Sequence, residues 1–358
     1  MGWTNGQGGR APSIGRRGLA RRGGVLALVC VVVGALVPAW APSGAGGVAT
    51  AAPPPAESVE GASDTGPRLV LRGHSHNDYW QTRPLLDALD LGFCSVEADV
   101  FLIEGELRVG HDVSECRPGR TLESLYLEPL LERVLTSVAR GHGPRVYVNM
   151  PEGGFFTLFI DVKRDGVAAY QHIERTLRAF DARCPGLFTR FVREGSRVIP
   201  GAIWVVISGD RACQAMAEQN DRLAFFDGRL SDLAPVALTD AAQPDAPPGQ
   251  WCAGTPNTKP VPTFMPVISD AWRSHFSWPG VGPMPERERR VLHEFVREVH
   301  ARGGRIRFWG TPNLPEMWRT LYDAGVDLIN CDELAHAADE LGRLAEAGSP
   351  PAARESGR

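Results

Sequence analysis

The chain has 358 residues, a formal net charge of -4, 43% hydrophobic residues and 22% charged residues. This composition excludes a wholly disordered protein, and the length fits either two domains or a single α/β barrel of about 250 residues. Only Lys163 and Lys259 are lysine, and the arginines form no basic tail or stripe. Nucleic acid is therefore not expected as a partner.

The N-terminal segment has the pattern of a secretory signal. An apolar run from Val25 to Ala41 follows a double-arginine pair, and small residues stand where a signal peptidase cuts. We therefore predict a signal peptide over residues 1–41 and a secreted protein; the alternative is an uncleaved N-terminal segment that anchors the chain to the cell membrane. Residues 42–65 are predicted to be a disordered linker and residues 346–358 a disordered tail.

Short apolar strands alternate with helical patterns over residues 66–345. The predicted strands are Leu69–Arg72, Cys94–Ile103, Phe156–Val162, Ile203–Ser208, Leu223–Phe226, Phe264–Ile268, Arg305–Trp309 and Leu328–Cys331. The predicted helices with the clearest apolar faces are Thr121–Ala139, Arg289–Arg302 and Leu334–Ala345. This alternation predicts an α/β fold, a single (β/α)₈ TIM barrel. A doubly wound open sheet is the alternative, but no glycine-rich nucleotide motif follows a strand. The Pro-rich stretch Ala241–Val261 is predicted to be a surface loop.

Paired carboxylates stand on the second predicted strand. Because side chains alternate along a strand, Glu97 and Asp99 share one face, while the apolar residues between and beside them share the other. The apolar face must pack under helices, so both acids are expected to point into the barrel. Two neighbouring carboxylates repel each other unless a cation or a proton lies between them, and a hard divalent cation is the simplest partner.

Later strands repeat this alternation. Asp161 and Lys163 share a face of the third predicted strand, which adds a third acid and a rare lysine to the interior. Trp309 and Asn330 end two of the last strands on the polar side, where barrels place their sites. Position alone leaves two readings open for Lys163, a structural partner of Asp161 or a catalytic group, and two for Trp309, core or the wall of a ligand site. Asn330 is expected to contact a substrate.

Histidines follow two of these strands. His74 and His76 come directly after the first predicted strand, and His111 follows the carboxylate strand after a short return. Imidazoles move protons near neutral pH, so two of them beside a metal-bound phosphate would serve as base and acid. The H-x-H spacing also fits zinc ligands, which leaves a zinc amidohydrolase-like barrel as an alternative.

The chain resembles the glycerophosphodiester phosphodiesterase and phosphatidylinositol phospholipase C-like superfamily, in particular its altered-inheritance-of-mitochondria-type branch. The matching strings, which run from Gly73 to Leu334, are GHSHNDYWQTRPLLDAL, SVEADVFL, LRVGHD, TLESLYLEPL, FIDVK, RFWGTPN and AGVDLINCDEL. The H-R-G and E-N-T motifs of ordinary glycerophosphodiester phosphodiesterases are missing, which argues against simple glycerophosphodiester substrates.

The resemblance implies a (β/α)₈ barrel with a divalent cation, Mg²⁺ or Ca²⁺. It implies that Glu97, Asp99 and Asp161 bind the metal and that His111 is one catalytic histidine. For the other, His74 and His76 both fit, and the G-H-x-x-N pattern of the related spider-venom phospholipase D selects His74. Lys163 and Trp309 resemble the phosphate-contacting lysine and pocket tryptophan of that relative.

The expected activity is thus metal-dependent cleavage of a phosphodiester by histidine acid–base catalysis. The substrate is expected to be a small-molecule, glycerol or lipid-derived phosphodiester, which implies transient contact with a membrane surface if it is a lipid. The nucleophile is water, which gives hydrolysis, or a substrate hydroxyl, which gives a cyclic phosphate. The other alternative is a non-catalytic exported binding protein.

Overall fold

The computed structural model describes residues 66–233 and 263–348. The predicted signal peptide and linker, the loop predicted at 241–261 and nearly all of the predicted C-terminal tail lie outside these residues. Among the described residues, no helix is long and apolar enough to cross a membrane.

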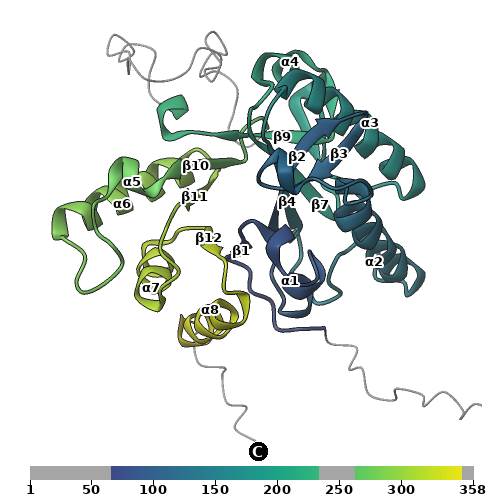
Figure 1. Ribbon diagram of the computed structural model, residues 1–358. Helices are drawn as coiled ribbons and strands as arrows, with labels where there is room; N and C mark the ends of the chain where they lie inside the picture. Colours follow the sequence, from purple (N-terminus) through teal and green to yellow (C-terminus); the bar gives the residue numbers. More distant parts are fainter. Residues whose placement is uncertain (1–65, 234–262, 349–358) are drawn as a thin grey trace, which may run out of the picture. The chain divides into compact units, whose positions relative to one another are not determined.

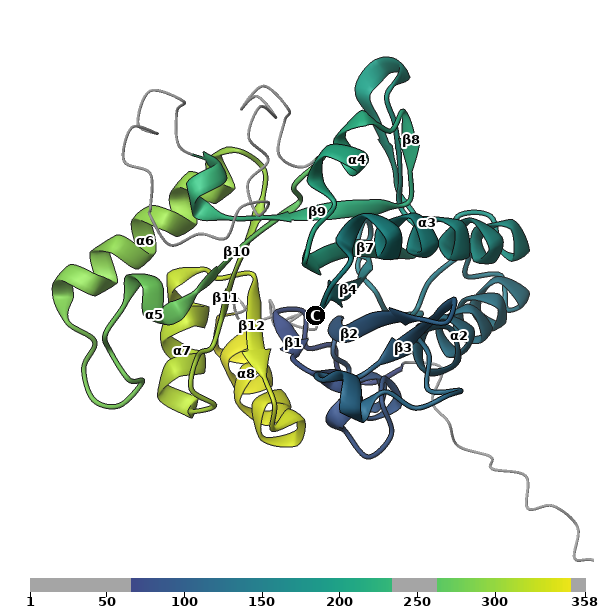
Figure 2. The ribbon, with the colours of Figure 1, turned by 45° about the horizontal axis from the view of Figure 1, so that its top comes forward.

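Eight parallel strands close into a barrel, and Figure 2 shows them as a ring with the helices outside it. The strands are β1 (Gly73–Ser75), β2 (Ser95–Ile103), β4 (Phe156–Val162), β7 (Ile203–Gly209), β9 (Ala224–Gly228), β10 (Val267–Ala271), β11 (Arg305–Trp309) and β12 (Leu328–Cys331). They neighbour one another in chain order, and the first strand pairs with both the last and the second, which closes the ring. The predicted (β/α)₈ barrel is confirmed.

Helices cover the outside of this ring (Figure 1). They are α1 (Leu86–Asp90), α2 (Glu128–Ala139), which continues a π-helical turn at Glu123–Leu127, α3 (Gly166–Arg183), α4 (Cys213–Glu218), α5 (Trp272–His275), α6 (Glu286–Ala301), α7 (Pro315–Ala324) and α8 (Leu334–Gly348). Strand β3 (Glu106–Val109) pairs antiparallel with β2. A separate small sheet has the order β6-β5-β8, from Arg197–Ile199, Arg190–Val192 and Asp221–Arg222. Short 3₁₀ turns lie at Asp78–Trp80, Val113–Glu115, Glu194–Ser196 and Leu230–Leu233.

Three strands, β4, β11 and β12, have the predicted bounds. The strand predicted at Leu69–Arg72 is wrong: only Val70 forms a bridge there, to Phe93, and the strand itself begins at Gly73. A turn closed by the hydrogen bond from Gly73 N to Val70 O ends the extended stretch and leaves Leu71 exposed. His74 therefore lies within β1 and His76 directly follows it, whereas the predicted strand ended before both histidines.

The alternation along the strands separates two apolar clusters. On β2, Val96, Ala98 and Val100 face the helices and belong to the large outer core. Inside the barrel, a small cluster of Phe159, Val206, Val267 and Leu328 fills the lumen. The polar residues of the same strands stand beyond this apolar plug, at the carboxyl ends of the strands. Cys94 and Cys331 are free and buried.

Candidate active site

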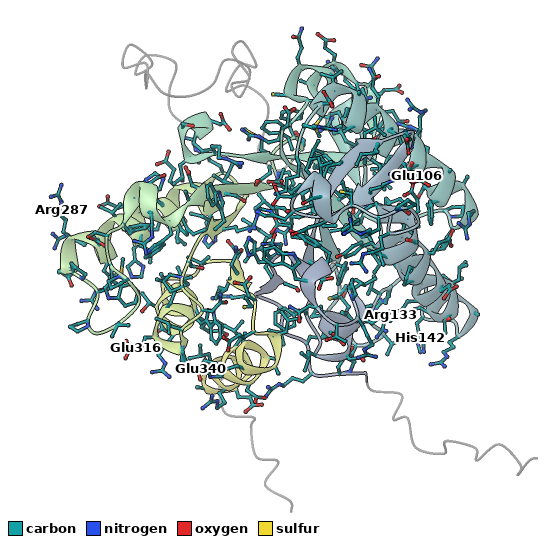
Figure 3. All side chains as sticks on the ribbon, viewed as in Figure 1. Glu106, Arg133, His142, Arg287, Glu316 and Glu340 are labelled. Carbon is teal, nitrogen blue, oxygen red and sulfur yellow. The ribbon has the colours of Figure 1, made fainter. Side chains whose placement is uncertain are left out.

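Buried charges gather at the carboxyl ends of the strands. Charged side chains such as Arg287 and Glu316 point outward at the periphery of the molecule (Figure 3), as solvated charges normally do. Glu97 and Asp99, in contrast, are only 4% and 1% exposed. Carboxylates are almost never fully buried without partners, so their neighbours define the chemistry of this site.

Asp99 and Asp161 face one another across neighbouring strands, because they are register partners in the β2–β4 pair. Lys163, two residues further along β4, reaches both acids: its Nζ lies 2.6 Å from Asp99 Oδ2 and 3.0 Å from Asp161 Oδ1. The predicted grouping of Asp99, Asp161 and Lys163 on one interior face is thus present.

Glu97 has a different cationic partner. Arg307 Nη2 on β11 donates to Glu97 Oε2 at 2.9 Å, and Arg307 Nε donates to Asn330 Oδ1 at 2.9 Å. The guanidinium also lies over the ring of Phe159, 5.0 Å from its centroid. Arg307 was not among the predicted site residues. Asn330, predicted to contact substrate, is 4% exposed and fixes this arginine.

Tyr79 is a second residue that the sequence analysis missed. It is buried in the 3₁₀ turn that follows β1, and its hydroxyl donates to Asp99 Oδ2 at 2.7 Å. Three groups therefore converge on that one oxygen, since His111 Nδ1 also lies 3.1 Å from it and Lys163 Nζ is the third. Tyr79 lies outside the predicted strands, so the alternation of side chains along a strand could not show that it faces the acids.

The electrostatics of the acids follow from burial and charge. Burial and the charge of Glu97 raise the pKa of Asp99, and the same two causes raise the pKa of Asp161 to about 6. Burial acts to raise the pKa of Glu97, but the Arg307 guanidinium together with the neighbouring His74 and His76 outweighs burial and holds that pKa well below its usual range. Three acids facing two fixed cations leave a negative site that a further cation would stabilise.

The three histidines occupy different environments. His74 on β1 is fully buried, its Nδ1 lies 2.7 Å from Ser95 Oγ, and its Nε2 lies 3.6 Å from Glu97 Oε2. Burial, together with the Arg307 charge, lowers the pKa of His74 to about 4, so this ring is neutral at physiological pH.

His76 and His111 both reach the cavity described below. Burial lowers the pKa of His76, but its hydrogen bond to Asp332 and the charge of Glu97 outweigh that cause, and its pKa lies above the ordinary value. The side chain of His111 is 48% exposed, and its ring meets Trp80 edge to face at 5.5 Å.

A single cavity of about 1220 Å³ opens over these groups. Its lining includes Glu97, Asp99, Asp161, Lys163, His76, His111, Arg307 and Trp309. It also extends across the barrel to polar residues on and after β7, β9 and β10, among them Arg229 and Asp270. His74 and Asn330 are not part of the lining. The cavity has room for a phosphoryl group together with an organic substituent.

The donor set fits a hard divalent cation. Among the described residues, no three acidic, histidine or cysteine side chains already surround a common point as a formed metal site would. Asp99 Oδ1, however, is buried and has no hydrogen-bond partner, and Asp161 stands opposite it in register. Carboxylate oxygens are the ligands that Mg²⁺ and Ca²⁺ prefer. An ion at the acids would replace or displace the ammonium group of Lys163 that now lies between Asp99 and Asp161.

Comparison with known proteins agrees with this class of barrel. Residues 67–227 match the model of the AIM6-like phosphodiesterase domain. The chain is 30% identical over 290 residues to the altered inheritance of mitochondria protein 6 homolog of Arthroderma benhamiae, covering 75% of this chain and 85% of that protein. It is 28% identical over 288 residues to altered inheritance of mitochondria protein 6 of Eremothecium gossypii, covering 74% and 68%.

A similar solved structure is a glycerophosphodiester phosphodiesterase from Parabacteroides distasonis, with 15% identity, a TM-score of 0.40 and coverage of 76% of this chain and 98% of that one. The closed ring of eight parallel strands makes the molecule a TIM barrel, and its residues 67–227 match the AIM6-like phosphodiesterase domain. It belongs to the altered inheritance of mitochondria protein 6 family.

Proposed function

We propose that the protein is a divalent-cation-dependent phosphoric diester hydrolase that acts on a small-molecule, glycerol or lipid-derived phosphodiester. One observation carries the proposal: three interior acids, a lysine and two accessible imidazoles line one cavity at the carboxyl ends of the barrel strands. Family membership supports it, because the matching domain is described as phosphodiesterase-like. A non-catalytic binding protein has no use for proton-transfer groups beside a cation site.

Glu97, Asp99 and Asp161 would hold the cation. The ion, when bound, supplies positive charge to the non-bridging phosphate oxygens. Lys163 adds a second positive contact from the same face, and the half-exposed Trp309 forms a wall of the cavity against the organic substituent. The apolar plug and the buried Arg307–Asn330 pair beneath the acids keep their positions fixed.

Proton transfer falls to His111 and to one imidazole at the end of β1. His111 Nδ1 is oriented by Asp99 at 3.1 Å, which leaves Nε2 free to face a substrate. One imidazole removes the proton of the attacking water, and the other protonates the oxygen that leaves phosphorus.

A panel of phosphodiesters tests the proposal. Glycerophosphodiesters, phosphatidylinositol, lysophospholipids, sphingomyelin and bis-p-nitrophenyl phosphate would be incubated with and without Mg²⁺ or Ca²⁺, and phosphorus NMR would identify the products. A phosphomonoester shows hydrolysis, and a cyclic phosphate shows attack by a substrate hydroxyl. Cleavage of no member of the panel, or stoichiometric tightly bound zinc, contradicts the proposal.

His111→Ala should lower turnover roughly 10²–10⁴-fold without unfolding the protein. His142→Ala is the matched control, because His142 is exposed on the periphery, as Figure 3 shows, and is absent from the cavity lining. Equal activity of the two variants would remove His111 from the mechanism.

A further inference from the structure

The two histidines at the end of β1 differ in their access to the cavity. His74 is fully buried within the strand, where its ring lies edge to face against Phe159 with 5.0 Å between centroids. His76 lies just beyond the strand, lines the cavity and has a side chain that is 27% exposed. A substrate that enters the cavity meets the ring of His76 and not that of His74.

A dedicated set of polar contacts fixes the ring of His76. Its Nδ1 lies 2.8 Å from Asp332 Oδ1, and its backbone N donates to Cys331 O at 3.1 Å. Asp332 is itself held from two sides: Asn313 Nδ2 donates to Asp332 Oδ2, and Asp332 N donates to Asn313 Oδ1 at 2.9 Å. A carboxylate bonded to Nδ1 sets the tautomer of an imidazole and stabilises its protonated form.

The remaining nitrogen of this ring points toward the acids. His76 Nε2 lies 3.7 Å from Glu97 Oε2, while His111 Nδ1 lies 3.1 Å from Asp99 Oδ2. Since Glu97 and Asp99 are two residues apart on one face of β2, each accessible imidazole contacts a different member of the carboxylate pair. Displacement at phosphorus needs one proton acceptor and one proton donor, and these two rings supply both.

We propose that His76 is the catalytic residue at the end of β1, and that Asp332 and Asn313 are its positioning residues. His74 is a buried ring that is held by Ser95 and lies outside the cavity lining. The inference rests on the proposed function and assigns residues within it. It differs from the resemblance, which selected His74.

The step balances with these groups. A water oxygen forms a bond to phosphorus, and the bond from phosphorus to the leaving oxygen breaks with its electron pair. One imidazole takes the proton of the water, and the protonated partner gives its proton to the leaving oxygen. The diester and water become a phosphomonoester and an alcohol, and a proton exchange between the two rings through solvent restores the enzyme.

Imidazole rescue tests the assignment on a substrate that the wild-type protein cleaves. His76→Ala should lower kcat roughly 10²–10⁴-fold, and added imidazole should restore part of the turnover, because the ring it replaces faces the cavity. His74→Ala removes a buried ring, so any loss there should appear with a lower melting temperature and without imidazole rescue. Rescue of His74→Ala but not of His76→Ala would overturn the proposal, as would near-wild-type turnover of His76→Ala.

A titration with Mg²⁺ separates proton transfer from metal binding. If His76 moves a proton, His76→Ala keeps its low kcat at saturating Mg²⁺. Recovery of kcat at high Mg²⁺ would instead make His76 a metal ligand and refute the inference. A failure of the proposed function can be told apart from a failure of this inference. If the proposed function is wrong, the wild-type protein itself cleaves none of the phosphodiesters.

A double-mutant comparison tests the positioning role of Asp332. Asp332→Asn should lower kcat at least tenfold with little change in KM, and it should add less than about threefold to the loss in His76→Ala, because it acts through that ring. If the two losses of kcat multiply in the double variant, Asp332 has a role independent of His76, and the assignment is contradicted. His76→Gln and circular dichroism of each variant exclude unfolding as the cause.

Discussion

The ion pair between Arg307 and Glu97 allows a quantitative test of how the interior of the barrel is held. The two side chains are 2% and 6% exposed, and their N–O distance is 2.9 Å. Arg307→Met keeps much of the volume of the side chain but leaves the Glu97 carboxylate buried without its cation. Breaking one partner of a buried pair costs about 3–5 kcal/mol, which for a chain of this size corresponds to a fall in Tm of about 6–20 °C.

Thermal and urea unfolding followed by circular dichroism would measure this loss. A chelator is included so that no divalent cation replaces the guanidinium. Arg183→Met is the control, because Arg183 pairs with Glu128 at 2.7 Å while both side chains are nearly half exposed. That surface pair should contribute less than about 1 kcal/mol.

The double variant Arg307→Met/Glu97→Gln should be more stable than the sum of the two single losses predicts, because it leaves no unpaired charge. A loss below about 1 kcal/mol in Arg307→Met, or strictly additive losses, would show that the Glu97 charge is stabilised by something other than Arg307.

Two further predictions concern the surroundings of the site. Gly209→Ala should cost about 1–3 kcal/mol and lower turnover at least tenfold, because φ is 71° and the new Cβ would lie 2.6 Å from Asp161 Oδ1. Gly105→Ala is the control: φ is 82° there too, but no atom lies within 4 Å of the added Cβ, so this variant has only the strain of the backbone conformation. Equal activity of the two variants would contradict the prediction. Burial raises the pKa of Asp78 to about 6, so the folded state binds its proton more tightly than the unfolded state, and stability from this group increases as pH falls from 7 to 4. Asp78→Asn should remove about 1–1.5 kcal/mol of that increase when the free energy of denaturant unfolding at pH 5 is compared with that at pH 8; an unchanged pH dependence would show that Asp78 does not carry it.

The alternation along β2 and β4 was enough to predict which residues face the interior. Polar and apolar residues alternate along both strands, and the polar positions are Glu97, Asp99, Asp161 and Lys163. The structure brings these side chains together because β2 and β4 are parallel neighbours and Asp99 pairs with Asp161 in register. Local pattern and the rules of parallel barrels carry this part of the site.

Other parts of the site depend on contacts between residues that are far apart in the sequence, and no local sequence pattern predicts such contacts. Arg307 and Glu97 are 210 positions apart in the sequence. Their ion pair across the lumen forms because the barrel closes, and no short-range spacing of residues predicts it. His74 and His76 have the same alternation, so the sequence alone could not separate them. Their difference is one of depth, which is set by where β1 begins and by the turn before Gly73.

The seam where β12 meets β1 has a consequence for biosynthesis. His76 comes from one edge of this seam and Asp332 from the other, although 256 positions separate them. A nascent chain that has emerged only through β9 already holds Glu97, Asp99 and Asp161, yet it has neither Arg307 nor Asp332. The proposed activity would therefore arise late, when the final strand docks, and an incomplete or C-terminally clipped polypeptide would lack it.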